Sequence, residues 1–270
     1  MDDRVQVTIA GGVADVRMVR ADKMNALDAA MFEALVATAK RLRSEKGLRA
    51  VVLSGEGRAF CAGLDMGRFA EMKDKGGNGI AGGEARDLTS RTEGIANFPQ
   101  MAVWGWRELP VPVIAAVHGV AFGGGFQLAL GADMRFLSAD ARMSIMEIKW
   151  GLVPDMAGTP ILASLVRDDI LRELTYTGRI FSAQEALNYG LATRICDDPR
   201  AAAFEAAREI AGKSPDAIRA AKRLLNGLPV DPAAALLAES IEQQKLIGSA
   251  NQQEAVSANI DRRLANFVDP

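Results

Sequence analysis

The 270-residue sequence predicts an α/β fold, because short β-branched segments alternate with helical patterns along much of the chain. The strand signals are clearest at 50–55 and 111–117, where apolar runs are bounded by glycine or proline. In the last third, helix-start signals follow one another instead. We therefore expect an α/β core over residues 1–198 and a C-terminal helical region over 199–270.

The N-terminal elements follow from their patterns. Two alternating segments, 5–11 and 13–20, are joined by Gly11-Gly12, which predicts a hairpin. An amphipathic helix is expected to begin near Asp28, before the strand at 50–55. Its apolar face contains Met31, Leu35, Ala39 and Leu42.

The middle of the chain contains its most informative segment, HGVAFGGGFQLA at 118–129. Three glycines at 123–125 follow the predicted strand at 111–117 and begin an apolar helix pattern, FQLALGAD, at 126–133; another strand is expected at 134–139. Unpaired N–H groups and the helix dipole at such a turn favour a negatively charged oxygen. The pattern matches neither common phosphate-binding loop, and a tight turn that only glycine can adopt is the alternative.

A second glycine turn follows the strand at 50–57. Its sequence, RAFCAGLDMGRF at 58–69, has small residues around Gly63 and an acidic Asp65 shortly after. Two such turns could place two N–H donors around one oxygen, which is the geometry of an oxyanion hole.

The C-terminal part contains clear helix boundaries. Ser182 and Glu185 form a capping-box pattern whose helix ends at Gly190. Further helices are predicted to begin at Asp198-Pro199, Ser214-Pro215 and Asp231-Pro232. The alanine- and leucine-rich segment 233–241 indicates subunit packing, although a helix that covers its own core would show the same pattern.

Composition excludes several classes of protein. With 32 Lys and Arg against 34 Asp and Glu, the net charge is −2, which argues against a nucleic-acid partner. No apolar run approaches the ~20 residues that span a membrane, and we expect a cytoplasmic protein without membrane contact. Cys61 and Cys196 are too few for a disulfide framework or a metal site. His118, the single histidine, is interpreted as a hydrogen-bonded structural residue.

Four segments resemble the crotonase (enoyl-CoA hydratase/isomerase) superfamily in sequence and order: AFCAGLDM, IAAVHGVAFGGGFQLALGADMRF, ARMSIMEIKWGLVPDMAGT and TGRIFSAQEALNYGLATRI. The resemblance covers roughly residues 5–270. It implies a crotonase-like spiral of repeated ββα units, with C-terminal helices that build a homotrimer or a hexamer. It also implies an acyl-CoA thioester substrate, with coenzyme A arriving as part of that substrate and with no metal or redox cofactor.

The resemblance assigns roles to several residues of this chain. The backbone N–H groups of Leu64 and Gly124 match the family's oxyanion hole, while Gln127 and Glu147 occupy the positions of the two hydratase glutamates. Asp155 stands where hydratases usually have glycine and resembles a carboxylate of the dienoyl-CoA isomerase branch. That branch also has an acidic residue at the position of Gln127, so its full triad is absent here. A Pro-Asp turn whose side chain caps the local backbone is the alternative for Asp155.

Substrate or CoA contacts are implied for Lys23, Ala62, Asp65 and Gly123. The segment 70–98 borders the acyl pocket by resemblance, or is simply a flexible surface loop. Near the C-terminus, Asn259 stands where the family usually has an aromatic residue.

Together these residues predict double-bond migration in an unsaturated acyl-CoA. Glu147 is expected to be the principal acid and base, with Asp155 assisting and Gln127 orienting a water or a carbonyl. Because Gln127 cannot transfer a proton as a glutamate does, two-carboxylate hydration is disfavoured. The alternatives are hydration of a 2-enoyl-CoA by Glu147 alone, another acyl-CoA reaction of the superfamily, and a non-catalytic acyl-CoA-binding protein.

Overall fold

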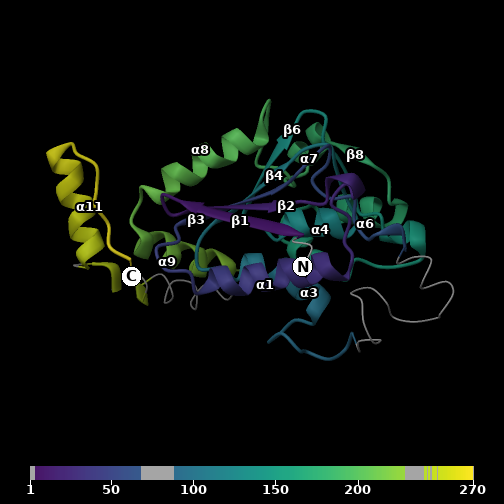
Figure 1. The fold of residues 1–270 in the computed structure, drawn as a ribbon, viewed down its shortest axis with the longest axis horizontal. Helices are drawn as coiled ribbons and strands as arrows, with labels where there is room; N and C mark the ends of the chain where they lie inside the picture. Colours follow the sequence, from purple (N-terminus) through teal and green to yellow (C-terminus); the bar gives the residue numbers. More distant parts are fainter. Residues whose placement is uncertain are drawn as a thin grey trace.

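The computed structural model describes residues 4–67, 88–228 and 240–269, except 242, 244 and 248 (Figure 1). Its centre is a six-stranded sheet of order β1-β2-β3-β4-β6-β9. The strands are β1 (Val5–Ala10), β2 (Val13–Met18), β3 (Ala50–Gly55), β4 (Val113–Val117), β6 (Met134–Ser138) and β9 (Arg194–Cys196). Only the β1–β2 pair is antiparallel, which confirms the predicted hairpin; the other neighbours are parallel.

A second, three-stranded sheet includes the residues that directly precede the three glycines at 123–125. It consists of β5 (Val120–Phe122), β7 (Arg142–Ser144) and β8 (Phe181–Ser182), in the order β5-β7-β8. Strand β5 pairs in parallel with β7, and β7 is antiparallel to β8. These strands were not predicted from the sequence, because two or three residues are too few to show an alternating pattern.

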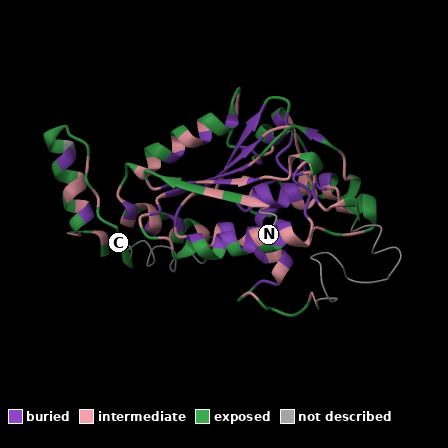
Figure 2. Ribbon diagram, in the orientation of Figure 1, coloured by how far each residue is buried: buried purple, intermediate pink, exposed green. Residues whose placement is uncertain are grey.

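Helices cover both faces of the large sheet (Figure 1). Helices α1 (Ala29–Arg43) and α3 (Phe98–Arg107) pack against each other below it in this view, and α8 (Pro199–Ala211) lies above, on β3, β4 and β6. Burial follows this layering, since the faces of the sheet and of α1 that meet are buried (Figure 2). The α8 side of the sheet forms a separate apolar cluster that includes Val52, Ile114, Phe136, Ala203 and Ala207. The site therefore rests on a sheet packed on both sides.

Helix α1 has the predicted boundary and face. The Asp28 carboxylate accepts a hydrogen bond from the Met31 N–H at 2.8 Å, which caps the helix at its first turn. The four predicted apolar residues of this helix are all buried. Local sequence signals were sufficient here because capping and amphipathicity agree.

Further helices of the described residues include η1 (Ala21–Lys23), α4 (Gly124–Leu130), η3 (Glu147–Trp150), α5 (Gly158–Leu162), α6 (Asp168–Thr177), α7 (Ala183–Asn188), α9 (Pro215–Asn226) and α11 (Ala250–Asp261). The capping box of Ser182 and Glu185 is present, and Asp198 caps α8. Ser214 precedes α9, but its side chain makes no capping hydrogen bond, so Pro215 marks this helix start.

The described part of the predicted C-terminal region 199–270 is mainly helical. Helices α8, α9 and α11 follow one another, and α11 extends away from the sheet at the far left of Figure 1. The predicted helix start at Asp231 and most of the segment 233–241 lie outside the described residues, as does most of 70–98. In the described ranges, no helix combines the length and the apolar character that crossing a membrane requires.

Candidate active site

The two glycine turns contact each other through their backbones. The Cys61 N–H donates to the Val120 carbonyl, and the Phe122 N–H donates to the Cys61 carbonyl, both at 3.1 Å. A Cβ atom at Gly125 would overlap the Cys61 carbonyl oxygen, so only glycine permits this approach. Gly63, at φ +89°, faces the second turn in the same way: a Cβ there would lie 2.5 Å from the Phe122 carbonyl oxygen. The glycines noted in the sequence thus serve to join two turns.

Where the two glycine turns meet, two backbone N–H groups have no acceptor among the described residues. Among the hydrogen bonds of the described residues, neither the Leu64 N–H nor the Gly124 N–H has a protein acceptor, although their neighbours do. The Asp65 N–H donates to the Leu27 carbonyl at 3.1 Å, and the Gly123 N–H donates to the Ser144 carbonyl at 3.0 Å. A Cβ built at Gly63 would lie 3.7 Å from the Gly124 nitrogen, which shows how close the turns are. Their arrangement is compatible with the predicted oxyanion hole.

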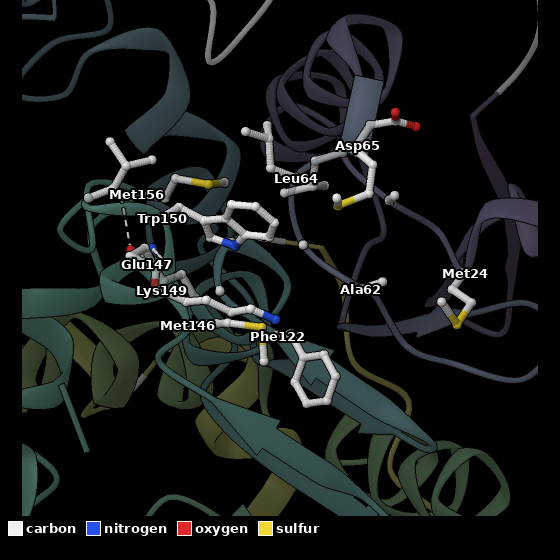
Figure 3. A pocket seen from close by; sticks show the side chains of 18 of the residues that line it. Met24, Ala62, Leu64, Asp65, Phe122, Met146, Glu147, Lys149, Trp150 and Met156 are labelled. Atoms are coloured by element: carbon white, nitrogen blue, oxygen red, sulfur yellow. Dashed lines mark hydrogen bonds between the residues drawn. The ribbon is translucent and has the colours of Figure 1, made fainter. Parts of the chain in front are cut away.

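Both turns line one cavity of about 800 Å³. Figure 3 shows Ala62, Leu64 and Asp65 on one side, with Glu147, Lys149 and Trp150 on the other. The wall is largely apolar, with charged side chains from η1 and η3. No group of three or more metal-binding side chains occurs in the described part of the chain. The cavity therefore combines an apolar wall with backbone donors and carboxyl groups.

Glu147 is the first residue of η3, and its carboxylate faces the glycine turn. A Cβ built at Gly123 would lie 3.5 Å from Oε1, and the Gln127 amide donates to the same oxygen at 2.6 Å. The other oxygen, Oε2, is buried and has no hydrogen-bond partner among the described residues. Burial raises the pKa of Glu147, and the negative charge of Asp155 raises it further. Glu147 lines the cavity, and a carboxyl group whose pKa is raised in this way is suited to exchange a proton with a substrate.

Gln127 is buried, with 1% of its surface exposed, and its side chain connects three segments. Its amide nitrogen donates to Glu147, while its carbonyl oxygen accepts from the N–H groups of Met156 at 2.9 Å and Gly158 at 3.0 Å. These partners fix the orientation of the amide, because only its oxygen can accept from two N–H groups. From the sequence, Gln127 was expected to orient a water or a carbonyl. In the structure its side chain holds Glu147 and the turn after Asp155.

Asp155 lies half-buried on the same cavity as Glu147. Burial raises its pKa. A contact with its own backbone N–H opposes this shift, so the acid–base role of Asp155 and the alternative of a capped turn both stay predictions. Glu147 and Asp155 are therefore two carboxyl groups that both favour the protonated form more than usual.

The predicted binding residues occupy different parts of the cavity. Lys23 is exposed at the edge in η1, whereas Ala62 and Gly123 line the interior. Asp65 also lines the cavity, but its carboxylate is paired with Arg20 at 2.6 Å and accepts from the Gly67 N–H at 2.8 Å. Burial alone would raise the pKa of Asp65, yet these two contacts hold it below its usual value. Arg20 was missed, since no local pattern links positions 45 apart in sequence.

The other candidate side chains have structural partners. Burial raises the pKa of Cys61 to about 12, so its thiol stays protonated and is unsuited to be a nucleophile. Cys61 and Cys196 are both free cysteines, as expected. The His118 ring lies 2.9 Å from the Gly57 carbonyl, which confirms it as a hydrogen-bonded residue.

Comparisons with known proteins agree with this fold. The model of the enoyl-CoA hydratase/isomerase family matches residues 8–270. Carnitinyl-CoA dehydratase of Proteus mirabilis is 35% identical over 227 residues, which cover 83% of this chain and 80% of that protein. The mitochondrial Delta(3,5)-Delta(2,4)-dienoyl-CoA isomerase of Mus musculus is 33% identical over 228 residues, which cover 82% and 68%. The crystal structure of an enoyl-CoA hydratase from Bacillus anthracis superposes with a TM-score of 0.86 at 29% identity and 98% coverage of both chains.

The chain belongs to the enoyl-CoA hydratase/isomerase family, because the family model spans nearly all of it. The α/β fold is that of the crotonase superfamily, as the sequence motifs predicted. Its relatives include both a dehydratase and a dienoyl-CoA isomerase, so membership defines an acyl-CoA enzyme and leaves the reaction to be argued from the site.

Proposed function

We propose that this enzyme moves a double bond within an enoyl- or dienoyl-CoA. The observation that carries the proposal is the position of Gln127, whose amide is committed to Glu147, Met156 and Gly158. An amide does not transfer a proton as a carboxyl group does, so Glu147 is the acid and base of the two side chains at the hydratase glutamate positions. Asp155, on the same cavity, supplies a second carboxyl group. Isomerisation needs proton removal at one carbon and proton return at another, and no activated water.

The reaction would proceed through an enolate. Glu147 takes a proton from the carbon α or γ to the thioester carbonyl. The electron pair moves onto the thioester oxygen, directly from the α carbon or through the intervening carbon–carbon double bond from the γ carbon. The Leu64 and Gly124 N–H groups stabilise that oxygen, at about 3–4 kcal/mol per donor in comparable sites. Return of a proton to the other end of the conjugated system, with Asp155 assisting, completes the shift.

Substrate binding would rest on the coenzyme A portion. Lys23, Ala62 and Gly123 are proposed to contact it, while Asp65 acts through its ion pair with Arg20 next to Leu64. No metal or redox cofactor is required, since the overall change only moves a proton. A homotrimer or hexamer is proposed in addition, because Val256, Ile260 and Leu264 at the C-terminal end expose apolar side chains.

Hydration or dehydration is the second candidate. It is favoured by the similarity to carnitinyl-CoA dehydratase, and it would use Glu147 with a water held by the remaining amide hydrogen of Gln127. A protein that binds acyl-CoA without turnover is the candidate from a different class.

The deciding experiment incubates the enzyme in deuterated water with a 3-enoyl-CoA, a 3,5-dienoyl-CoA and crotonyl-CoA, with products identified by mass spectrometry. We expect a shifted double bond from one of the first two substrates and no added water on crotonyl-CoA. A 3-hydroxyacyl-CoA product would assign the protein as a hydratase. A thermal shift with CoA esters in the absence of any turnover would assign it to binding alone.

A further inference from the structure

A cluster of paired charges lies where α1 begins, next to the glycine turn that contains Leu64. Arg20 pairs with the Asp65 carboxylate at 2.6 Å and with the Asp28 carboxylate at 3.4 Å. Arg4 also pairs with Asp28, at 2.9 Å. The Arg20 side chain is 13% exposed and that of Asp65 19%, so solvent screens this pair only weakly. The cluster therefore binds its segments together more firmly than an exposed ion pair would.

The backbone around Leu64 is joined to the residue that precedes the cap of α1. The Leu27 N–H donates to the Gly63 carbonyl at 2.8 Å, and the Asp65 N–H donates to the Leu27 carbonyl at 3.1 Å. The Leu64 N–H, between these two hydrogen bonds, has no acceptor among the described residues. Its position therefore depends on how residues 63–65 lie against residues 26–28.

The Arg20 guanidinium contacts both of these segments. Its Nη1 donates to the Ala26 carbonyl at 3.0 Å and to Asp65 Oδ2 at 2.6 Å. Its Nη2 lies 3.4 Å from Asp28 Oδ2, so contacts on both sides of Leu27 come from one side chain. Because a guanidinium group is planar and rigid, these contacts fix the separation of the two segments.

The same pair compensates a charge beside Leu64. Burial raises the pKa of Asp65, but the hydrogen bonds from Gly67 and Arg20 outweigh burial and hold that pKa below its usual value. Asp65 is therefore ionised at neutral pH, one residue from the N–H group proposed to bind an enolate oxygen. A negative charge there opposes the charge that develops on that oxygen, and Arg20 offsets it.

We propose that Arg20 is a positioning residue of the oxyanion hole. It holds residues 26–28 and 63–65 together, so that the Leu64 N–H is placed to donate to the thioester oxygen. Arg20 does not line the cavity formed by the described residues, and it acts through Leu27 and Asp65. The inference rests on the oxyanion hole of the proposed function. It holds for isomerisation and hydration alike, because both place negative charge on that oxygen.

Arg20→Met tests the proposal, with Arg4→Met as a matched control. Arg4 pairs with Asp28, so its loss removes a positive charge from the same cluster but keeps the contact between Arg20 and Asp65. The backbone of Arg20 should stay in place in Arg20→Met. Its N–H donates to Asn25 Oδ1 and its carbonyl accepts from the Asn25 N–H, both at 2.9 Å.

The measurement is infrared spectroscopy of bound butyryl-CoA that carries an isotopic label at the thioester carbonyl. Hydrogen bonds to the carbonyl oxygen weaken the C=O bond and lower its stretching frequency. The frequency therefore reports directly on the Leu64 and Gly124 donors. No turnover is needed, because this saturated ester has no double bond to move.

We expect the carbonyl frequency to fall when butyryl-CoA binds to the unmodified enzyme. Arg20→Met should lose at least half of this shift, and its kcat should fall at least tenfold, since complete removal of an oxyanion donor costs about 10²–10³-fold. The dissociation constant of butyryl-CoA, measured by calorimetry, should stay within about threefold. Arg4→Met should have a lower melting temperature but the full carbonyl shift and an unchanged kcat.

A full carbonyl shift in Arg20→Met, with only the melting temperature lowered, would show a merely structural role and overturn the proposal. Binding of butyryl-CoA to the unmodified enzyme without any shift would overturn it as well. Because loss of one partner from a largely buried ion pair can prevent folding, Arg20→Lys is the second variant. Its ammonium group keeps the charge but cannot make all the guanidinium contacts, so only part of the shift should remain. A full shift in Arg20→Lys would also overturn the proposal.

Turnover of the same proteins separates this inference from the proposed function. If Arg20→Met loses the carbonyl shift but the unmodified enzyme moves no double bond of a 3-enoyl-CoA, the role of Arg20 stands and the isomerase proposal fails. If the unmodified enzyme moves the double bond and Arg20→Met keeps both its kcat and the carbonyl shift, the isomerase proposal stands and the role of Arg20 fails.

Discussion

The two sides of the cavity are held in place by different kinds of interaction. On one side, the turns around Gly63 and Gly124 hold their N–H donors through backbone hydrogen bonds and close contacts that only glycine allows. On the other, Glu147 and the turn after Asp155 depend on one buried side chain, Gln127. The backbone side can therefore stabilise an enolate oxygen whatever the reaction, whereas the side-chain side decides where protons go.

The two sides of the cavity also differ in how they respond to pH. The backbone donors do not titrate, but burial raises the pKa of Glu147, with a further contribution from Asp155, and burial raises the pKa of Asp155. The unfolded chain loses these two protons more readily than the folded enzyme. Both groups therefore reduce the stability of the fold as pH rises from their ordinary pKa values to the raised ones.

The largest expected effect comes from removing the base. Glu147→Gln keeps the size of the side chain but cannot accept a proton, so kcat should fall by about 10³-fold or more. The dissociation constant for a CoA ester, measured by calorimetry, should stay within about threefold because the backbone side is unchanged. If the variant keeps more than a tenth of its activity, Glu147 is not the base.

Asp155→Asn should lower isomerisation by about 10- to 100-fold, because the second carboxyl group is lost. It should impair isomerisation more than any hydration. It also removes a negative charge that raises the pKa of Glu147, so the acidic limb of the kcat/KM profile should move to lower pH. If the acidic limb of the kcat/KM profile does not move, or if isomerisation and hydration lose activity equally, Asp155 does not have the separate role in isomerisation proposed here.

Gln127→Ala tests whether the Gln127 side chain holds Glu147 and the turn after Asp155 in place. The buried N–H groups of Met156 and Gly158 would lose their acceptor, at about 1–3 kcal/mol each, and activity should fall about tenfold. Both the melting temperature and kcat should therefore decrease.

Gln127→Glu is the matched control, since it keeps an acceptor for both N–H groups. Its second oxygen would face Glu147, where the amide nitrogen is now 2.6 Å from Oε1, and the two carboxylates would have to share a proton. We expect stability close to that of the unmodified enzyme, with the acidic limb moved to higher pH. If both variants melt at the same reduced temperature, the hydrogen bonds to Met156 and Gly158 are not what supports the turn.

The same division explains how much the sequence could predict. The hairpin, α1, the core strands and the glycine turns carry local signals, and the family motifs located Leu64, Gly124, Glu147 and Asp155. The partners of Gln127 could not be predicted, because they combine α4, η3 and the turn at 156–158. Contacts between distant segments depend on side-chain directions that no local period specifies.

The smallest effect is expected on the backbone side. Leu64→Ala changes a side chain that packs partly against the core but retains the N–H group proposed to bind the enolate oxygen. Stability should decrease by about 1–2 kcal/mol for the lost apolar contact, while kcat should stay within about threefold. Thermal melts and single-turnover rates on the same preparation measure the two effects separately. A tenfold loss of kcat in a fully folded variant would mean that the leucine side chain, and not the backbone alone, positions the reacting thioester.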